Sequence, residues 1–166
     1  ISASKKRDRL PTNEELNLPT KYFFEKWSRA TYSYPMHLII WFAIYSCRRE
    51  AEITRMELAD YDQHNQLWKV RDLKNPTGSK GNNKEFHILP SCKQIVDLLM
   101  NPDIRNRMLK RGYSAEYLIP LSPKTIGGEF RKACKLLGIE DLKFHDLRHE
   151  GCTRLAEQGF TIPQIQ

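Results

Sequence analysis

The stretch "KFHDLRHEGC", residues 143–152, is the part of the sequence on which the interpretation of this chain depends. Residues three or four positions apart lie on the same face of a helix. A helix here places two imidazoles, a guanidinium and a thiol on one strip: His145, Arg148, His149 and Cys152. The adjacent stripe is expected to pack inward: Phe144, Leu147, Gly151 and Leu155. The polar strip therefore borders the core instead of facing open solvent.

Three kinds of site fit such a strip. His145 and His149 have the i, i+4 spacing of a zinc pair, and Cys152 could be a third ligand. Arg148 argues against a metal, because it places a permanent positive charge among these ligands. The second interpretation is structural, with polar residues that cap and pair locally. The third is an anion site, in which an arginine fork binds phosphate and a histidine one turn away donates or moves a proton.

The composition favours the anion site. At 166 residues and 40% hydrophobic content, the chain can bury one core. Lys and Arg number 27 against 20 for Asp and Glu, a net charge of +7 that favours a polyanionic partner such as nucleic acid. The most apolar run, residues 36–47, is too short to span a bilayer. We therefore expect a cytoplasmic protein with no membrane partner.

The four cysteines stand far apart in the sequence and form no C-x-x-C pair: Cys47, Cys92, Cys134 and Cys152. This spacing does not suggest a zinc framework. A disulfide set is not expected either, because the chain is rich in ordinary core residues. The prediction is four reduced thiols and no metal.

Periodicity and capping signals predict a mainly α fold with a small antiparallel β-hairpin or sheet (α+β). Two strands, "QLWKVRD" and "KEFHILP", are joined by the loop "KNPTGSKGNN". Ser91 is the expected cap of the helix that follows, and the segment after Met100 up to Tyr113 is ambiguous. The predicted helices cover about 13–30, 35–47, 49–58, 91–100, 123–137 and 145–158. Residues 1–12 are expected to be a linker and 13–166 one domain.

Three motifs together resemble the tyrosine recombinases, the phage-integrase family. "HDLRH" resembles the family's H-x-L-R-H box. Upstream, "SCRREAEITRMELADYD" resembles its other arginine box, R-x-x-E, in a register that selects Arg49 and not Arg48. Between them, "SKGNNKEFHILP" resembles the family's hairpin, whose lysine precedes a glycine, and this selects Lys80. The order of the motifs agrees with the family from about residue 35 onward.

The resemblance implies the tyrosine-recombinase catalytic-domain fold and cleavage and rejoining of duplex DNA through a 3′-phosphotyrosine, without a metal, a nucleotide cofactor or a small-molecule substrate. Arg49 and Arg148 would bind the non-bridging phosphate oxygens, where one preorganised donor is typically worth about 3 kcal/mol. Lys80 would be the general acid, and His145 would assist proton transfer or hold the phosphate. Lys74 and Lys84 stay as alternatives to Lys80 because the loop is long.

A second helix points to DNA on its own residues. In "SPKTIGGEFRKACKLLG", three basic residues fall almost in line: Lys124, Arg131 and Lys135. The opposite stripe is expected to be buried: Phe130, Ala133, Cys134 and Leu137. These aligned basic residues are suited to phosphate contacts, although a helix face that is exposed only to solvent would show the same pattern of residues.

Two family elements are not found after the "HDLRH" box, namely a second His or Trp and the nucleophilic tyrosine. All seven tyrosines precede Arg148: Tyr22, Tyr32, Tyr34, Tyr45, Tyr61, Tyr113 and Tyr117. The expectation is a catalytic domain without its C-terminal segment and its N-terminal DNA-binding domain, inactive by itself, from a nucleoid-associated parent that acts as a tetramer on DNA. The alternative is a non-catalytic DNA-binding or regulatory protein.

Overall fold

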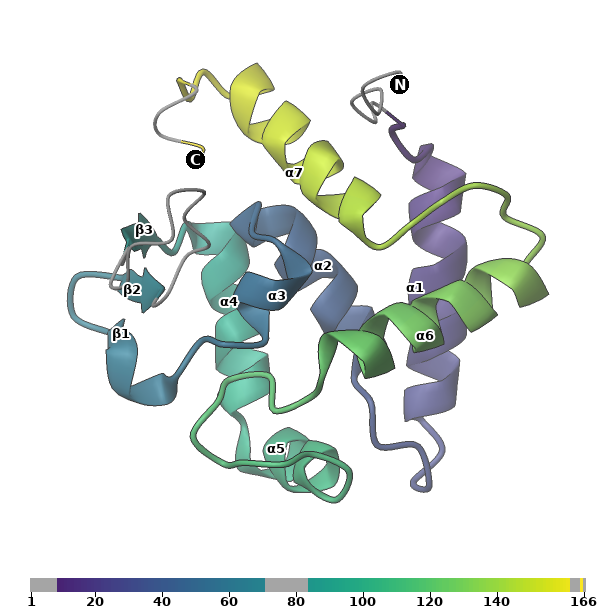
Figure 1. Ribbon diagram of the computed structural model, residues 1–166, viewed down its shortest axis with the longest axis horizontal. Helices are drawn as coiled ribbons and strands as arrows, with labels where there is room; N and C mark the ends of the chain where they lie inside the picture. Colours follow the sequence, from purple (N-terminus) through teal and green to yellow (C-terminus); the bar gives the residue numbers. More distant parts are fainter. Residues whose placement is uncertain (1–8, 71–83, 162–164, 166) are drawn as a thin grey trace, which may run out of the picture.

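Helix α2 (Met36–Ser46) is the centre of the fold in the computed structural model, which describes residues 9–70, 84–161 and 165. Four other helices contact it: α1 (Asn13–Trp27), α4 (Pro90–Met100), α6 (Pro123–Leu136) and α7 (His145–Glu157). Figure 1 shows α2 between the sheet and α4 on one side and α1 on the other, with α7 across the top. Apolar residues lie all round α2, so it can be buried on every side.

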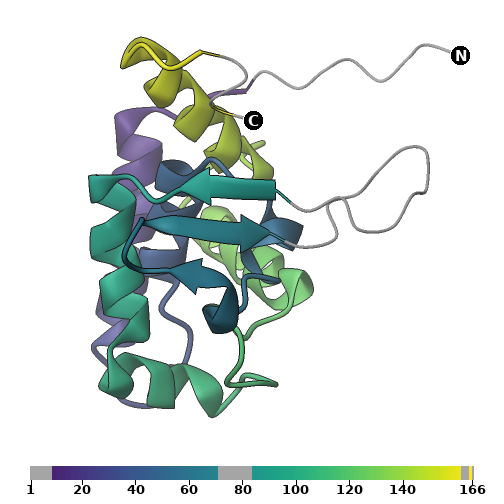
Figure 2. The same ribbon diagram turned by 90° about the vertical axis from the view of Figure 1, so that its left-hand side faces the viewer.

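A three-stranded antiparallel sheet lies on one side of the helices, in the order β1 (Tyr61–Asp62), β2 (Leu67–Val70) and β3 (Lys84–His87). Figure 2 views this sheet face on. The predicted pair of strands is confirmed, with Trp68 opposite Phe86. The first strand was not predicted, because two residues are too short to show an alternating pattern. It is held to β2 partly by Tyr61, whose ring stacks on that of Trp68 at 4.4 Å.

Local capping chemistry explains several helix ends. Thr12 and Glu15 form a capping box that begins α1. Ser122 caps α6, and Gly138 adopts a positive φ of 72° just beyond its end, as the sequence predicts. The predicted cap of α4 is wrong: the N-cap is Leu89, and Pro90 occupies the first turn, so Ser91 lies inside the helix.

Two segments differ from the predicted elements. The predicted helix over 49–58 is a single turn, α3 (Glu50–Ile53), followed by a 3₁₀ turn, η1 (Leu58–Asp60). The ambiguous segment after Met100 contains a helix, α5 (Pro102–Leu109), whose N-cap Asn101 accepts hydrogen bonds from two backbone amides. None of the helices in the described parts of the chain is long and apolar enough to cross a membrane.

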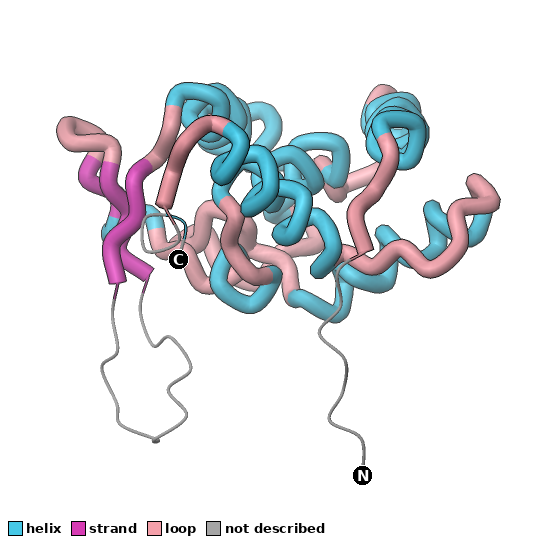
Figure 3. The backbone as a smooth tube through the Cα atoms, turned by 90° about the horizontal axis from the view of Figure 1, so that it is seen from above, coloured by secondary structure: helices cyan, strands magenta, loops and turns pink. Residues whose placement is uncertain are grey.

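Helices α2 and α7 approach each other closely at Gly151. A Cβ atom at this position would lie 2.1 Å from the carbonyl oxygen of Ile44, so only glycine fits without displacing backbone. The tube in Figure 3 shows the helices gathered beside the sheet, which lies at one edge of the molecule. This contact brings the "HDLRH" helix against the end of α2, where the other arginine box begins.

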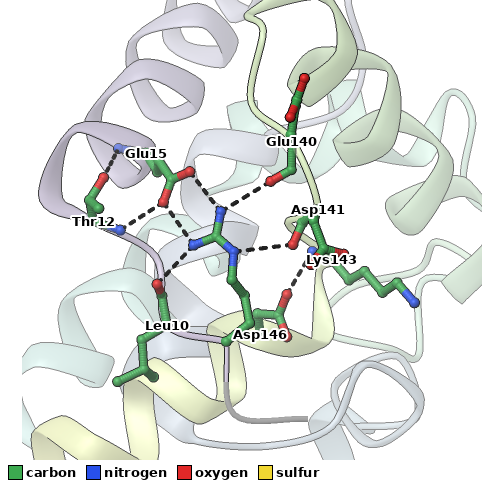
Figure 4. Close-up of polar contacts among 8 residues, drawn as sticks. Leu10, Thr12, Glu15, Glu140, Asp141, Lys143 and Asp146 are labelled. Atoms are coloured by element: carbon green, nitrogen blue, oxygen red, sulfur yellow. Dashed lines mark hydrogen bonds and ion pairs between the residues drawn. The ribbon is translucent and has the colours of Figure 1, made fainter.

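Arg9, in the segment predicted to be a linker, packs against the domain. Its guanidinium bonds both carboxylate oxygens of Glu15, at 2.9 and 2.7 Å. It also donates to the carbonyls of Glu140 and Asp141, at 3.1 and 3.2 Å. Figure 4 shows Glu15 on α1 facing the 140–141 turn, with Thr12 beside it. We call these four residues the Arg9 clamp (Arg9, Glu15, Glu140, Asp141). The clamp joins the start of α1 to the turn that leads into α7.

Candidate active site

Arg148 lies on the face of α7 that meets the C-terminal end of α2. Its Nε donates to the carbonyl oxygen of Cys47 at 3.2 Å, which fixes the position of the half-buried guanidinium. Its terminal amino groups donate to no residue in the described parts of the chain. Burial lowers the pKa of Arg148, and the positive charges of Arg49 and Arg48 lower it further. The positive charges of Arg48 and Arg49 therefore both act on the guanidinium of Arg148.

Arg48 and Arg49 are adjacent in sequence but have different environments. Arg48 is 5% exposed; it donates to the carbonyls of Ser46 and Ile165 and lies 5.2 Å over the Phe86 ring. Arg49 is exposed, and its side chain makes no hydrogen bond or ion pair with any described residue. The arginine that the motif register selects is therefore the one that can reach a ligand.

Glu52 contacts both the backbone of Arg49 and the guanidinium of Arg48. It is 9% exposed; one carboxylate oxygen accepts the backbone N–H of Arg49 at 3.0 Å, and the other lies 4.0 Å from the guanidinium of Arg48. The side chain of Arg49 forms no ion pair with Glu50, Glu52 or any other described glutamate. Glu52, the third residue of α3, caps the start of this helix and partly neutralises Arg48, whereas the Arg49 side chain is exposed.

His145 is the first residue of α7, where the partial positive charge of a helix N-terminus favours an anion. Burial lowers its pKa most, followed by the charges of His149 and Arg148; Arg49 acts in the same direction. The two imidazole rings are 4.8 Å apart, edge to face. The fold therefore brings His145, Arg148 and Arg49 into one electrostatic neighbourhood and favours the neutral imidazole.

The lysine predicted as general acid is outside the described residues, as is its alternative Lys74. The other alternative, Lys84, begins β3 and is exposed. It lines a surface cavity together with Arg48 and Phe86. The described strands therefore show where the hairpin leaves the sheet, and the position of Lys80 stays a prediction.

The three basic residues predicted to bind DNA are all exposed on α6: Lys124, Arg131 and Lys135. On its other side α6 buries Phe130, Ala133 and Cys134 as predicted, whereas Leu137 is only partly buried. Arg131 and Lys135 also line a cavity of about 680 Å³ that reaches His145 and Glu50. One hollow thus connects part of the basic face of α6 with His145.

Glu50 connects α3 to α6 across this cavity. A Cβ atom on Gly127 would lie 3.2 Å from a carboxylate oxygen of Glu50, so the glycine permits the close approach. Burial raises the pKa of Glu50, and a hydrogen bond from the backbone of Gly127 opposes that rise. Glycine is unfavourable inside a helix, and this contact is the reason that the fold supplies for Gly127.

The prediction of four reduced cysteines is wrong for two of them. Cys47 and Cys152 form a disulfide, although 105 residues separate them in sequence, because α7 packs directly on α2. The zinc interpretation fails with it, since the Cys152 sulfur is bonded to another sulfur. Among the described residues no group of three suitable side chains could hold a metal ion. Cys92 and Cys134 are buried thiols, as predicted.

Sequence reasoning missed Asp146 and the buried role of Arg48. Asp146 is completely buried, accepts the backbone N–H of Lys143 at 2.8 Å, and lies 3.9 Å from His149. Its position three residues after Lys143 is the spacing of an acidic residue that reaches back to cap a helix, and this signal could have been used. The burial of Arg48 has no local signal, because it depends on Phe86 and Ile165.

Comparison with known proteins agrees with the three motifs. The model of the phage integrase family matches residues 21–166. The prophage phiRv2 integrase of Mycobacterium tuberculosis is 24% identical over 144 residues, covering 79% of this chain and 38% of that protein. This chain therefore spans well under half the length of its curated relative.

Solved structures show the same fold. The Tn1549 transposon integrase, in complex with circular intermediate DNA, matches with a TM-score of 0.68 at 18% identity, over 100% of this chain and 58% of that one. The catalytic core of lambda integrase matches with a TM-score of 0.61 at 18% identity, over 92% of this chain and 89% of that one. The XerA recombinase matches with a TM-score of 0.61 at 22% identity, over 99% and 56%. The predicted recombinase catalytic-domain fold is confirmed.

Proposed function

Since this chain belongs to the phage integrase family, we propose that it is the catalytic domain of a site-specific DNA recombinase that cuts and rejoins duplex DNA through a 3′-phosphotyrosine. One observation carries the proposal: Arg49 and Arg148 come from distant parts of the chain, yet the Nε of Arg148 donates to the carbonyl of Cys47, two residues before Arg49. Two cations whose terminal groups donate to no described residue are suited to a shared anion.

The chemistry follows from the charge that develops during attack on a phosphodiester. Arg148 is oriented by the Cys47 carbonyl, so its terminal amino groups can bind non-bridging oxygens without reorganisation. Arg49 supplies the second cation from α3. His145, in the first turn of α7, adds a neutral imidazole that can donate or accept a proton at the phosphate. No metal or other cofactor is needed for these roles.

Lys80 is proposed as the general acid that protonates the 5′-oxygen leaving group. The test is Lys80→Ala on two DNA substrates, one with a 5′-bridging oxygen and one with a 5′-bridging sulfur at the scissile position. A thiolate leaves without protonation, so the variant should cleave the sulfur substrate at nearly the parental rate and the oxygen substrate far more slowly. Lys84→Ala and Lys74→Ala are the matched controls. An equal defect on both substrates would exclude Lys80 as the acid.

The DNA-binding face is proposed to be the exposed line on α6, formed by Lys124, Arg131 and Lys135. Each phosphate contact contributes about 0.9 to the slope of log affinity against log salt. Replacing all three by alanine should therefore reduce that slope by about 2 to 3. The control is Lys93→Ala, whose ammonium is already paired with Asp97 at 2.9 Å. An unchanged slope in the triple variant would show that α6 does not contact phosphate.

The complete reaction is proposed to need parts beyond these 166 residues. No tyrosine follows Tyr117, so the nucleophile and the second His or Trp are proposed to lie outside this sequence, as is an N-terminal DNA-binding domain before residues 1–12. We further propose that the parent acts in the cytoplasm, at the nucleoid, as a tetramer on two duplexes. The isolated chain should bind duplex DNA weakly and form no covalent adduct.

Incubation with a nicked duplex, followed by denaturing electrophoresis, tests the assignment of the nucleophile. An adduct formed by the 166 residues would show that one of the seven tyrosines is the nucleophile. The same assay on the natural-length protein separates a recombinase from a non-catalytic DNA-binding protein, because only the recombinase forms an adduct that denaturant does not release. Loss of that adduct in Arg148→Ala would then tie the chemistry to the arginine pair.

A further inference from the structure

We propose that the Cys47–Cys152 disulfide is a reversible cross-link that positions the arginine pair, so that cleavage depends on the redox state of these two sulfurs. The inference rests on the proposed function and adds a regulation to the same site. Cys47 and Cys152 are not ligands of the phosphate. They act through Arg49 and Arg148, and are positioning residues.

The disulfide lies between the two arginines. Cys47 is the C-cap of α2, with a left-handed φ of 53°, and the chain continues directly into Arg48 and Arg49. The carbonyl of the same Cys47 accepts the hydrogen bond from Arg148 Nε at 3.2 Å. Cys152 follows Arg148 by one helical turn on the same face of α7. One covalent bond thus joins the residue that begins the first arginine box to the helix that carries the second.

Without the cross-link, the contact between these helices depends on packing and on one hydrogen bond at this end. Gly151 touches the backbone of Ile44, so the two helices meet there backbone to backbone, with no side chain of α7 interlocking with α2 at this point. The Cα atoms of Cys47 and Cys152 are 5.6 Å apart, a separation that a disulfide spans without moving the backbone. The bond therefore restrains the motion that would change the spacing of the arginines.

A thiol reagent can reach the disulfide through the sulfur of Cys152. Cys47 is completely buried, whereas Cys152 is partly exposed at the edge of α7. Opening begins when a thiolate such as glutathione attacks the Cys152 sulfur and releases the Cys47 thiolate. A second glutathione then attacks the mixed disulfide and releases Cys152. Two electrons and two protons pass to the protein, and two glutathiones become one glutathione disulfide; oxidation by glutathione disulfide is the reverse.

Reduction should lower the rate of cleavage and leave DNA affinity unchanged. A displacement of about 1 Å in a group that binds the reacting atoms can reduce a rate by about 100-fold. We expect a fall of about 10-fold in the cleavage rate constant at saturating DNA, because the hydrogen bond from Arg148 to Cys47 still restricts the site. The proposed DNA-binding line is on α6, so the dissociation constant for duplex DNA should change by less than twofold.

The experiment uses the natural-length protein in glutathione buffers that range from fully reduced to fully oxidised, at a temperature where circular dichroism shows both forms to be folded. Alkylation and mass spectrometry report the fraction of protein with the cross-link, and single-turnover cleavage of a nicked duplex reports the rate. The two curves should have the same midpoint. Cys152→Ser should cleave at the slow rate in every buffer, and Cys92→Ser, which leaves the pair intact, should behave as the parent does.

The outcomes separate the inference from the proposed function. No cleavage in any buffer, with a normal thiol titration, would refute the recombinase assignment. Cleavage at one rate throughout, while alkylation shows the bond opening, would overturn the inference alone. Alkylation of both cysteines in the most oxidising buffer would overturn it as well. If Cys152→Ser does not fold, the titration of the parent protein still decides, because that measurement needs no variant.

Discussion

Two regions of this molecule use arginine in opposite ways. In the Arg9 clamp, one guanidinium is surrounded by acceptors: both carboxylate oxygens of Glu15 and the backbone carbonyls of Leu10, Glu140 and Asp141, as the dashed lines in Figure 4 indicate. At the end of α2, Arg148 is anchored to the carbonyl of Cys47, two residues before Arg49, and the terminal groups of both arginines donate to no described residue. In the first arrangement the protein supplies the acceptors for the guanidinium. In the second, the terminal donors of both arginines have no acceptor among the described residues.

Other arginines of the fold belong to the first kind. Arg107 lies 3.5 Å from the centre of the Trp27 ring and donates to the backbone carbonyls of Trp27, Arg29 and Tyr32. Arg48 is buried against Phe86 and is paired with Glu52. A guanidinium whose terminal donors are bound by protein acceptors stabilises the fold, and Arg107 does so although its buried Nε has no acceptor among the described residues. A guanidinium that is held in place and left without acceptors raises the local positive potential and binds anions.

The largest expected effect comes from breaking the charge pair. Arg49→Ala should reduce DNA cleavage by the natural-length protein by about 100-fold or more, since one preorganised donor is worth about 3 kcal/mol in the transition state. The free energy of unfolding should change by less than about 0.5 kcal/mol, because the side chain is exposed. Single-turnover cleavage and urea unfolding measure the two quantities. Arg111→Ala, at another exposed position, is the control; equal rates in both variants would contradict the assignment.

For Arg48, which precedes Arg49 in the sequence, the main expected effect of substitution is on stability. Arg48→Met should reduce the free energy of unfolding by about 3 kcal/mol, because it leaves the buried Glu52 carboxylate without its cation. The measurement is urea unfolding followed by circular dichroism. The double variant with Glu52→Gln should recover part of this loss, since no unpaired charge is then buried. A loss below about 1 kcal/mol in the single variant would show that Arg48 is not structural.

The Arg9 clamp should have a smaller effect, on stability alone. Arg9→Gln should reduce the free energy of unfolding by about 1 to 2 kcal/mol, because the pair is partly exposed to solvent. A double-mutant cycle with Glu15→Gln isolates the contribution of the pair. Thr12→Ala, which removes the neighbouring cap and leaves the ion pair, is the control. If the effects of Arg9→Gln and Glu15→Gln on the free energy of unfolding are strictly additive, the interaction between these two residues contributes nothing to stability.

The smallest effect is the pH dependence of the clamp. The hydrogen bond from Arg9 is the main reason why the pKa of Glu15 is lowered from 4.5 to about 2. The unfolded chain therefore takes up this proton first, and the stabilisation is complete above pH 4.5 and is lost as the pH falls toward 2. Denaturant titrations at pH 6, 4.5 and 3 should show an acid-dependent loss in the parent that is smaller in Arg9→Gln. Parallel curves for the two proteins would refute this origin.

Much of the fold and part of the site could be predicted from local sequence. The Thr12–Glu15 box, the Ser122 cap and Gly138 each act on neighbours a few residues away, and all three mark helix ends in the structure. The basic line on α6 follows from helical spacing alone. By contrast, the two-residue strand β1 and the four-residue helix α3 were missed or misjudged. Elements this short contain too little pattern, and their partners in the fold hold them in place.

The sequence by itself determined which residues share a helix face, where several helices begin and end, and that the two arginine boxes resemble one family. Only the tertiary structure decided that Arg48 is buried while Arg49 is exposed, that Cys47 and Cys152 are joined, and that Arg148 hydrogen-bonds the end of α2. The physical reason is the distance along the chain over which each interaction acts. Capping and periodicity depend on residues within about one turn, whereas the spacing of side chains about a hundred residues apart depends on how closely α7 can pack on α2.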